Sequence, residues 1–151
     1  MKLPSDVDEV IAAMKLPFQL VDLQKEDALE ACERGRFGLF YVVSTVTAKL
    51  WEDDHTIVVC PPILLPQWEE WLHACQEFDT SVFAGPRRTL DMLNHRWVIV
   101  SHAIFRDSFV DIMQHFKSKT VNVLLDEAQS IKNPKSKLYK CINQFCAPDR
   151  N

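Results

Sequence analysis

The chain is poor in glycine, lacks a long apolar run and lacks paired metal-binding cysteines, and each absence excludes a class of protein. Only three of its 151 residues are glycine, which excludes glycine-rich repeats and flexible glycine linkers. No apolar run reaches the roughly 18 residues of a membrane-spanning helix, and the first residues lack the apolar core of a secretion signal. We therefore expect a cytoplasmic protein without a membrane partner.

The five cysteines do not indicate a disulfide framework or a metal site. Their number is odd, they are widely spread, and no Cys-x-x-Cys pair occurs. No histidine stands beside them at the spacing of a zinc site. We interpret them as reduced thiols that mostly fill space in the core.

Charge is unevenly distributed along the chain. The formal net charge is −4, but residues 117–140 contain six lysines and two acids. A basic segment beside acidic residues suits a protein that binds a phosphate backbone. A solvated helix face would give the same pattern, so the charge alone leaves both interpretations open.

Apolar strands alternate with amphipathic helices along the chain. Short runs of β-branched and aromatic residues predict strands at 37–43, 56–60, 81–84, 97–100 and 121–125. Helical periodicity predicts helices at 23–34, from 62 onward, at 86–94, around 104–116 and at 135–146. This alternation predicts an α/β fold in three layers, with a parallel sheet and helices on both faces. We expect one domain over residues 1–151, with N-terminal helices within 1–35.

Two adjacent acids, Asp126 and Glu127, directly follow the apolar strand predicted at 121–125. In open α/β sheets, ligands bind just past the carboxyl ends of the strands. A carboxylate in that place can hold a Mg²⁺ ion bound to nucleotide phosphates, and its neighbour can polarise an attacking water. The alternative is an acidic turn whose aspartate caps a helix.

The residues that follow the two acids extend this pattern into a recognisable motif. The segment reads Asp126-Glu127-Ala128-Gln129-Ser130-Ile131-Lys132-Asn133. It resembles the Walker B motif of helicase superfamily two, the DEAD/DEAH-box-like proteins, and its Ile-Lys-Asn extension resembles the SWI/SNF-type DNA translocases. The resemblance implies a RecA-like P-loop NTPase lobe that uses ATP and Mg²⁺ to move on DNA. It also implies that Asp126 binds Mg²⁺, Glu127 orients the hydrolytic water and Gln129 couples the site to a second RecA-like lobe.

Two further segments resemble the DNA-backbone motifs of the same family. The first is a strand, a Pro61-Pro62 turn and a helix start, with Trp68 and Trp71 expected to pack in the core. The second follows the strand at 97–100, where His102 replaces the more usual tyrosine after Ser101. The resemblance implies DNA contacts by Pro62, Ser101, His102 and Lys132. Prolines that start a helix and a serine that caps one are the alternatives.

The nucleotide-binding segments are less complete. Gln24 stands where family members place a glutamine that recognises the adenine edge, although a solvent-facing helical glutamine would look the same. After the strand predicted at 37–43, the Gly-x-x-x-x-Gly-Lys-Ser/Thr phosphate loop of the family is missing. Ser44 and Thr45 are the nucleotide-binding candidates that remain there. We therefore expect weak or no ATP hydrolysis by this chain.

The resemblance runs from Gln24 to Lys137, in the family's order, and stops before the expected Thr-Gly-Thr-Pro-like motif. We expect an incomplete first lobe whose second lobe is missing. A rival interpretation is a degenerate, non-catalytic lobe that binds DNA or protein. A third is an unrelated small α/β protein with no link to nucleotides.

Overall fold

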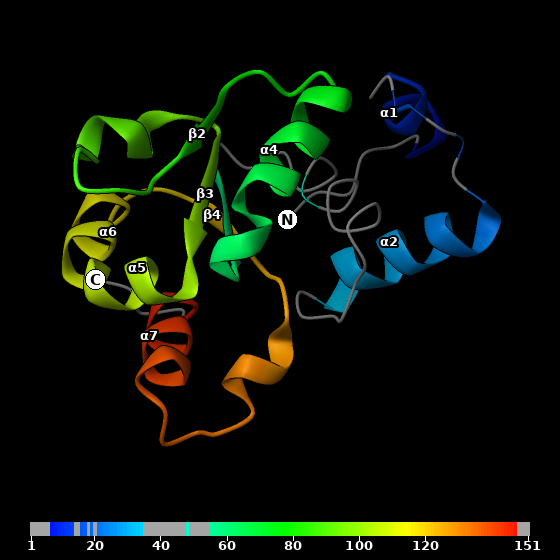
Figure 1. Cartoon of the computed structure of the whole chain (residues 1–151). Coiled ribbons are helices and arrows are strands. Elements are labelled where there is room, and N and C mark those ends of the chain that lie inside the picture. Colours follow the sequence, from blue (N-terminus) through cyan, green and yellow to red (C-terminus); the bar gives the residue numbers. More distant parts are fainter. Residues whose placement is uncertain are drawn as a thin grey trace. The chain divides into compact units, whose positions relative to one another are not determined.

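A computed structural model describes residues 7–13, 16–17, 19, 21–34, 48 and 55–147 (Figure 1). The chain divides into two compact units, which we describe separately. The first comprises Met1–Asp53 and Glu70–Phe78, and the second comprises Asp54–Glu69 and Asp79–Asn151. All strands of the described residues belong to the second unit.

The second unit is built on a parallel sheet of four strands, β1 (His55–Cys60), β2 (Thr80–Val82), β3 (Trp97–Ser101) and β4 (Val121–Leu125). Their order is β2-β3-β1-β4, and every neighbouring pair is parallel. The predicted α/β class, with a parallel sheet and helices on both faces, is confirmed. The strand predicted at 37–43 lies outside the described residues.

The two central strands are buried on both faces, as their nearly continuous apolar sequences predict. In register, Ile57 pairs with Val98 and Val59 with Val100. These four side chains face a core shared with aromatic residues from the helices that follow, including Phe105. The opposite faces of β1 and β3 are equally buried. Burial of this extent is the main stabilising contribution to the unit.

The helices after β3 differ from the prediction in one respect. One helix was expected around 104–116, but the structure has two, α5 (His102–Asp107) and α6 (Phe109–His115), separated at Ser108. Phe105 of α5 and Ile112 of α6 are both buried in the core. Likewise, the helix predicted at 86–94 is a 3₁₀ segment over Leu90–Asn94 alone, η2.

The last helix, α7 (Lys137–Phe145), begins two residues later than predicted. Ser136 caps it, because the serine hydroxyl accepts a hydrogen bond from the Tyr139 backbone N–H at 3.1 Å. The aromatic rings of Phe105 in α5 and Phe145 in α7 meet edge to face, with centroids 5.7 Å apart. Between β4 and α7 lies a short 3₁₀ segment, η3 (Ala128–Ile131).

After β1, the predicted helix start is confirmed as a 3₁₀ turn, η1 (Pro62–Leu64), that leads into α4 (Leu65–Ala74). The first residues of α4, up to Glu69, belong to the second unit, and the rest belong to the first. The described helices of the first unit are α1 (Val7–Ala13) and α2 (Asp22–Arg34). The prediction of a single domain over the whole chain stays a prediction. Among the described residues, no helix is long and apolar enough to cross a membrane.

Candidate functional site

Asp126 lies at the carboxyl end of β4, where the sheet's hydrogen-bond ladder ends. Its backbone N–H donates to the Val59 carbonyl at 2.9 Å, which fixes the residue beside the end of β1. Because all strands are parallel, Cys60, Ser101 and Asp126 come to the same edge of the sheet. This edge is where open α/β sheets bind ligands.

Both oxygens of the Asp126 carboxylate accept hydrogen bonds. The Trp68 indole N–H donates to Oδ2 at 2.9 Å, and the Glu127 backbone N–H donates to Oδ1 at 2.9 Å. The two bonds fix the plane of the carboxylate, since each oxygen is held from a different direction. A carboxylate has about four lone-pair sites, so this one keeps capacity for a cation. Asp126 therefore fits the role of a Mg²⁺ ligand.

The described residues contain no group of three or more His, Cys, Asp or Glu side chains that would hold a metal ion. Mg²⁺ in nucleotide enzymes is usually held by one or two carboxylates, with phosphate oxygens and waters supplying the rest of its octahedron.

Cys60 is buried beside the acid. Burial, and then the nearby Asp126 carboxylate, raise the pKa of this thiol to about 12. The thiol is therefore neutral at physiological pH. The interpretation of Cys60 as a packed, reduced thiol agrees with this environment.

Glu127 has a left-handed backbone, with φ 57° and ψ 53°. This conformation is costly for a residue with a Cβ and often occurs at functional sites. Its side chain is exposed and accepts a hydrogen bond from the Gln129 side-chain amide. The turn thus holds Glu127 and Gln129 together on the solvent side of the edge, next to the half-buried Asp126.

His102 joins the second predicted DNA segment to the acid. Its Nε2 lies 3.1 Å from the Asp126 backbone carbonyl, which can only accept, so Nε2 carries the proton in this bond. Ser101 is 3% exposed, and its hydroxyl accepts from the Ile104 backbone N–H at 3.2 Å. The structure therefore gives the Ser101 side chain the helix-capping arrangement that the sequence left as an alternative.

Pro62 and Lys132 are both exposed. Pro62 begins the η1 turn after β1, beside Ile63, a 79% exposed hydrophobic residue. Lys132 ends η3, where its backbone N–H donates to the Gln129 carbonyl at 3.2 Å. The edge of the second unit thus brings together Asp126, His102 and the start of α4 through direct hydrogen bonds, and it leaves Lys132 on the surface nearby in sequence.

The remaining predicted residues are not part of this described edge. Ser44 and Thr45 lie outside the described residues. Gln24 belongs to the first unit, where its side-chain Oε1 accepts from the Val21 backbone N–H at 3.1 Å. This is the reciprocal half of a capping box, so Gln24 helps to start α2.

One residue bonded to this edge was not predicted as a site residue. Trp68 was expected only to pack, and at 2% exposed it does so, but its indole also holds Asp126. Arg88 lies past the end of β2, where its Nη1 donates to the Gly85 carbonyl at 2.8 Å and its guanidinium lies 5.8 Å from the centre of the Phe83 ring. It lines a surface hollow of about 400 Å³ with Ser108 and Asp111.

Comparison with known proteins places this fold. No protein-family profile matches the chain. The chain is similar to the DNA repair protein RAD5B of Arabidopsis thaliana, with 28% identity over 130 residues that cover 78% of this chain and 10% of that protein. It is also similar in structure to the SWI2/SNF2 ATPase core of Sulfolobus solfataricus, solved in complex with double-stranded DNA. That match has a TM-score of 0.69 and 20% identity, and covers 85% of this chain and 30% of the other.

These comparisons show the fold of the chain and a resemblance that extends over most of it. The chain has the RecA-like α/β fold found in the SWI2/SNF2 ATPase core. It spans about a tenth of the curated relative's length and less than a third of the structural relative's.

Proposed function

We propose that the chain is the first RecA-like, ATP-binding lobe of a SWI/SNF-type, ATP-dependent DNA translocase. Supporting this are the Asp-Glu-x-Gln segment at the carboxyl end of β4, the RecA-like fold and the similarity to RAD5B. In this role Asp126 binds the Mg²⁺ of Mg·ATP, Glu127 orients the hydrolytic water and Gln129 couples the site to a second lobe. Gln24 contacts the adenine edge, and Ser44 and Thr45 contact the phosphates.

DNA is the second ligand of the proposal. Pro62, Ser101, His102 and Lys132 contact the DNA backbone, which carries no sequence information. For Ser101 the contact runs through the backbone, since its hydroxyl caps α5.

The observation that carries the proposal is a pair of hydrogen bonds to one acid. The helix that follows the Pro61-Pro62 turn contacts the Asp126 carboxylate through Trp68. The segment that begins at Ser101 contacts the Asp126 carbonyl through His102. Both proposed DNA segments are thus bonded directly to the proposed Mg²⁺ ligand, so a shift of either segment on DNA would move the acid. Such a two-way link is what coupling of ATP chemistry to DNA binding requires.

The test is linkage between nucleotide and DNA. We expect the purified chain to bind duplex DNA in a salt-dependent way, and its DNA affinity to change when Mg²⁺ and a non-hydrolysable ATP analogue are added. Asp126→Ala should abolish that change while leaving DNA binding itself in place, because the carboxylate contacts the metal and not the DNA. Little phosphate release is expected from the chain alone, since the Gly-Lys-Thr phosphate loop is missing. Robust DNA-stimulated hydrolysis would contradict that expectation.

A non-catalytic DNA- or protein-binding lobe is the second candidate, and the missing phosphate loop favours it. For such a module, DNA affinity would not respond to Mg²⁺ and the ATP analogue, and the double change Asp126→Ala with Glu127→Ala would leave DNA binding and its salt dependence intact. A chain that binds neither DNA nor nucleotide at low salt would overturn the translocase proposal and leave only protein binding.

A further inference from the structure

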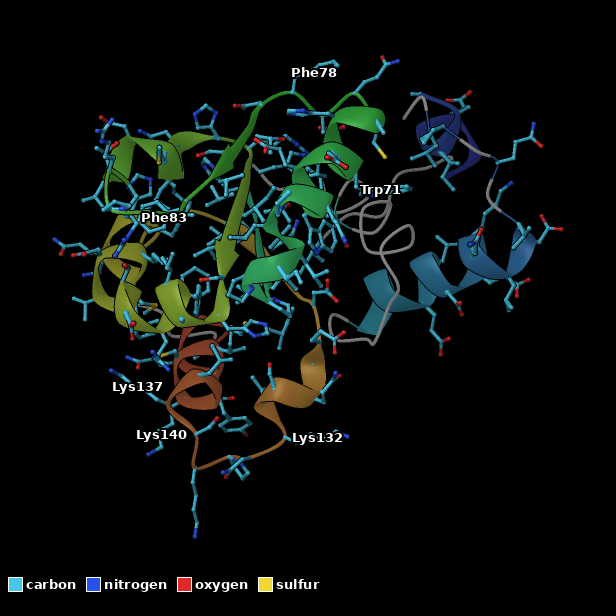
Figure 2. The ribbon with its side chains drawn as sticks, viewed as in Figure 1. Trp71, Phe78, Phe83, Lys132, Lys137 and Lys140 are labelled. Atoms are coloured by element: carbon cyan, nitrogen blue, oxygen red, sulfur yellow. The ribbon has the colours of Figure 1, made fainter. Side chains whose placement is uncertain are left out.

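The segment that follows the candidate site carries only positive charge. Residues 128–147 contain four lysines, Lys132, Lys135, Lys137 and Lys140, and no acid. All four lysines are exposed. Figure 2 shows Lys132, Lys137 and Lys140 at the end of the second unit formed by η3 and α7. We refer to these four residues as the basic surface.

The backbone beneath the basic surface is well anchored. On α7, Cys141, Ile142 and Phe145 are buried in the core, while Lys137 and Lys140 are exposed to solvent. Before the helix, the backbone N–H of Lys135 donates to the Asn133 side chain at 3.0 Å, which fixes the turn. The lysines are therefore presented from an ordered scaffold, which reduces the entropy lost when they bind a partner.

The charges of the basic surface are not neutralised within the part of the chain that the structure describes. No described ion pair or hydrogen bond involves the side chain of any of the four lysines. Asp107 is an acid on which Lys137 has an electrostatic effect. Its carboxylate is already paired with Arg106 at 2.7 Å. The Arg106 hydrogen bond first, and Lys137 to a lesser degree, lower the pKa of Asp107. Four free cations on one ordered segment favour a polyanionic partner.

The residues around the four lysines indicate which class of partner the basic surface binds. The other exposed residues of 128–147 are small or polar, among them Ser130, Asn133, Asn143 and Gln144, and none of the large exposed hydrophobics lies in this range. A protein interface needs buried aromatic or aliphatic anchors, and a membrane-binding helix needs an apolar face to insert. Lysines with serine and amide side chains are instead the usual contacts to nucleic-acid phosphates.

We propose that the whole basic surface binds the phosphate backbone of duplex nucleic acid, so that the contact proposed for Lys132 continues over Lys135, Lys137 and Lys140. This inference rests on the proposed function, in which DNA already lies at the adjoining edge of the sheet. Because lysines on phosphates read no base edges, the contact increases affinity and salt dependence but not sequence preference.

The experiment measures the affinity of the purified chain for a fluorescent DNA duplex at several salt concentrations. Each lysine on a phosphate contributes about 0.9 to the slope of log K against log salt for B-DNA. We expect K137Q/K140Q to lower the slope by up to about 2, and the triple variant K135Q/K137Q/K140Q by up to about 3. Replacement of all four lysines by arginine should retain the slope. The circular dichroism of each variant checks that α7 persists.

The matched control removes two exposed positive charges elsewhere on the second unit, with Arg87→Gln and Lys117→Gln. If the control lowers the slope as much as a lysine pair does, net charge alone explains the effect and the inference is overturned. The inference is also overturned, and the proposed function stands, if the triple variant K135Q/K137Q/K140Q binds with an unchanged slope while His102→Ala weakens binding. If the unmodified chain does not bind duplex DNA at low salt, both proposals fail.

Discussion

The Trp68 indole N–H donates a hydrogen bond of 2.9 Å to the Asp126 carboxylate, between residues 58 positions apart in the sequence. The bond joins the first turn of α4, which leaves the end of β1, to the acid that ends β4. An indole N–H can donate a single hydrogen bond, and here it donates that bond to a carboxylate oxygen. The position of the first turn of α4 is thereby linked directly to the orientation of the candidate catalytic acid.

The Trp68–Asp126 bond should be measurable as a coupling energy. Trp68→Phe removes the donor, and Asp126→Asn removes the charge of the acceptor, so each alone should lower the free energy of unfolding. A hydrogen bond to a charged group contributes about 1.5–3 kcal/mol. Because Asp126 is only half-buried, water will replace part of the bond, and we expect a coupling of about 1 kcal/mol. Urea denaturation of the two single variants and the double variant gives this number. Simple additivity of the two effects would show that the bond adds nothing in solution.

The left-handed backbone at Glu127 should lower the stability of the fold, because a residue with a Cβ is strained at positive φ. Glu127→Gly and Glu127→Ala both remove the carboxylate that Gln129 contacts. They differ in backbone freedom, because glycine adopts positive φ without the clash of a Cβ. We expect the glycine variant to unfold at a free energy about 1 kcal/mol higher than the alanine variant, as measured by thermal and urea denaturation. Equal stabilities would mean that the turn relaxes to an ordinary backbone in solution.

Asn122 should be replaceable with a gain in stability. This residue of β4 is 6% exposed, and among the described residues its side-chain Nδ2 has no hydrogen-bond partner. A buried polar group without a partner costs about 1–3 kcal/mol. Asn122→Val removes this group and suits a strand, so we expect the free energy of unfolding to rise by about 1 kcal/mol. Asn122→Ala, which leaves a cavity, should be the less stable of the two. A destabilising valine would indicate that Asn122 has a partner in solution.

The thiols should separate into unreactive and reactive groups. With its pKa raised to about 12, buried Cys60 should resist a thiol reagent at pH 8, whereas exposed Cys146 should react quickly. Mass spectrometry of the labelled peptides checks this difference, and urea should abolish it. Rapid labelling of Cys60 in the folded protein would show that the end of β1 opens readily.

Cys60 also sets a pH dependence at the alkaline end. The unfolded chain loses this proton near the ordinary pKa of 9.0, and the folded protein near 12. Between these values the folded state binds more protons, so the free energy of unfolding should fall as pH rises and should not depend on Cys60 below about pH 8. Cys60→Ala should flatten that fall, although Cys141, whose pKa burial also raises, retains part of it. An unchanged alkaline slope in Cys60→Ala would contradict the assignment.

The sequence by itself determined the α/β class and most of the elements of the second unit. Strand β4 has the bounds that its apolar run predicted, and the carboxyl-end position of Asp126 follows directly from where that run stops. Such features are local, because periodicity and turn residues act over a few positions. The break between α5 and α6 at Ser108 was not predictable in this way, since the periodicity of apolar residues continues through it.

Tertiary structure alone decided which side chains meet Asp126. Trp68 was predicted to pack, and His102 to face DNA, yet both donate hydrogen bonds to the same residue. Their partners depend on the strand order β2-β3-β1-β4, which places the ends of β1, β3 and β4 side by side. The physical reason is that a hydrogen bond between segments separated by one or more crossover connections depends on how helices pack on the sheet, and no local pattern of residues encodes that geometry.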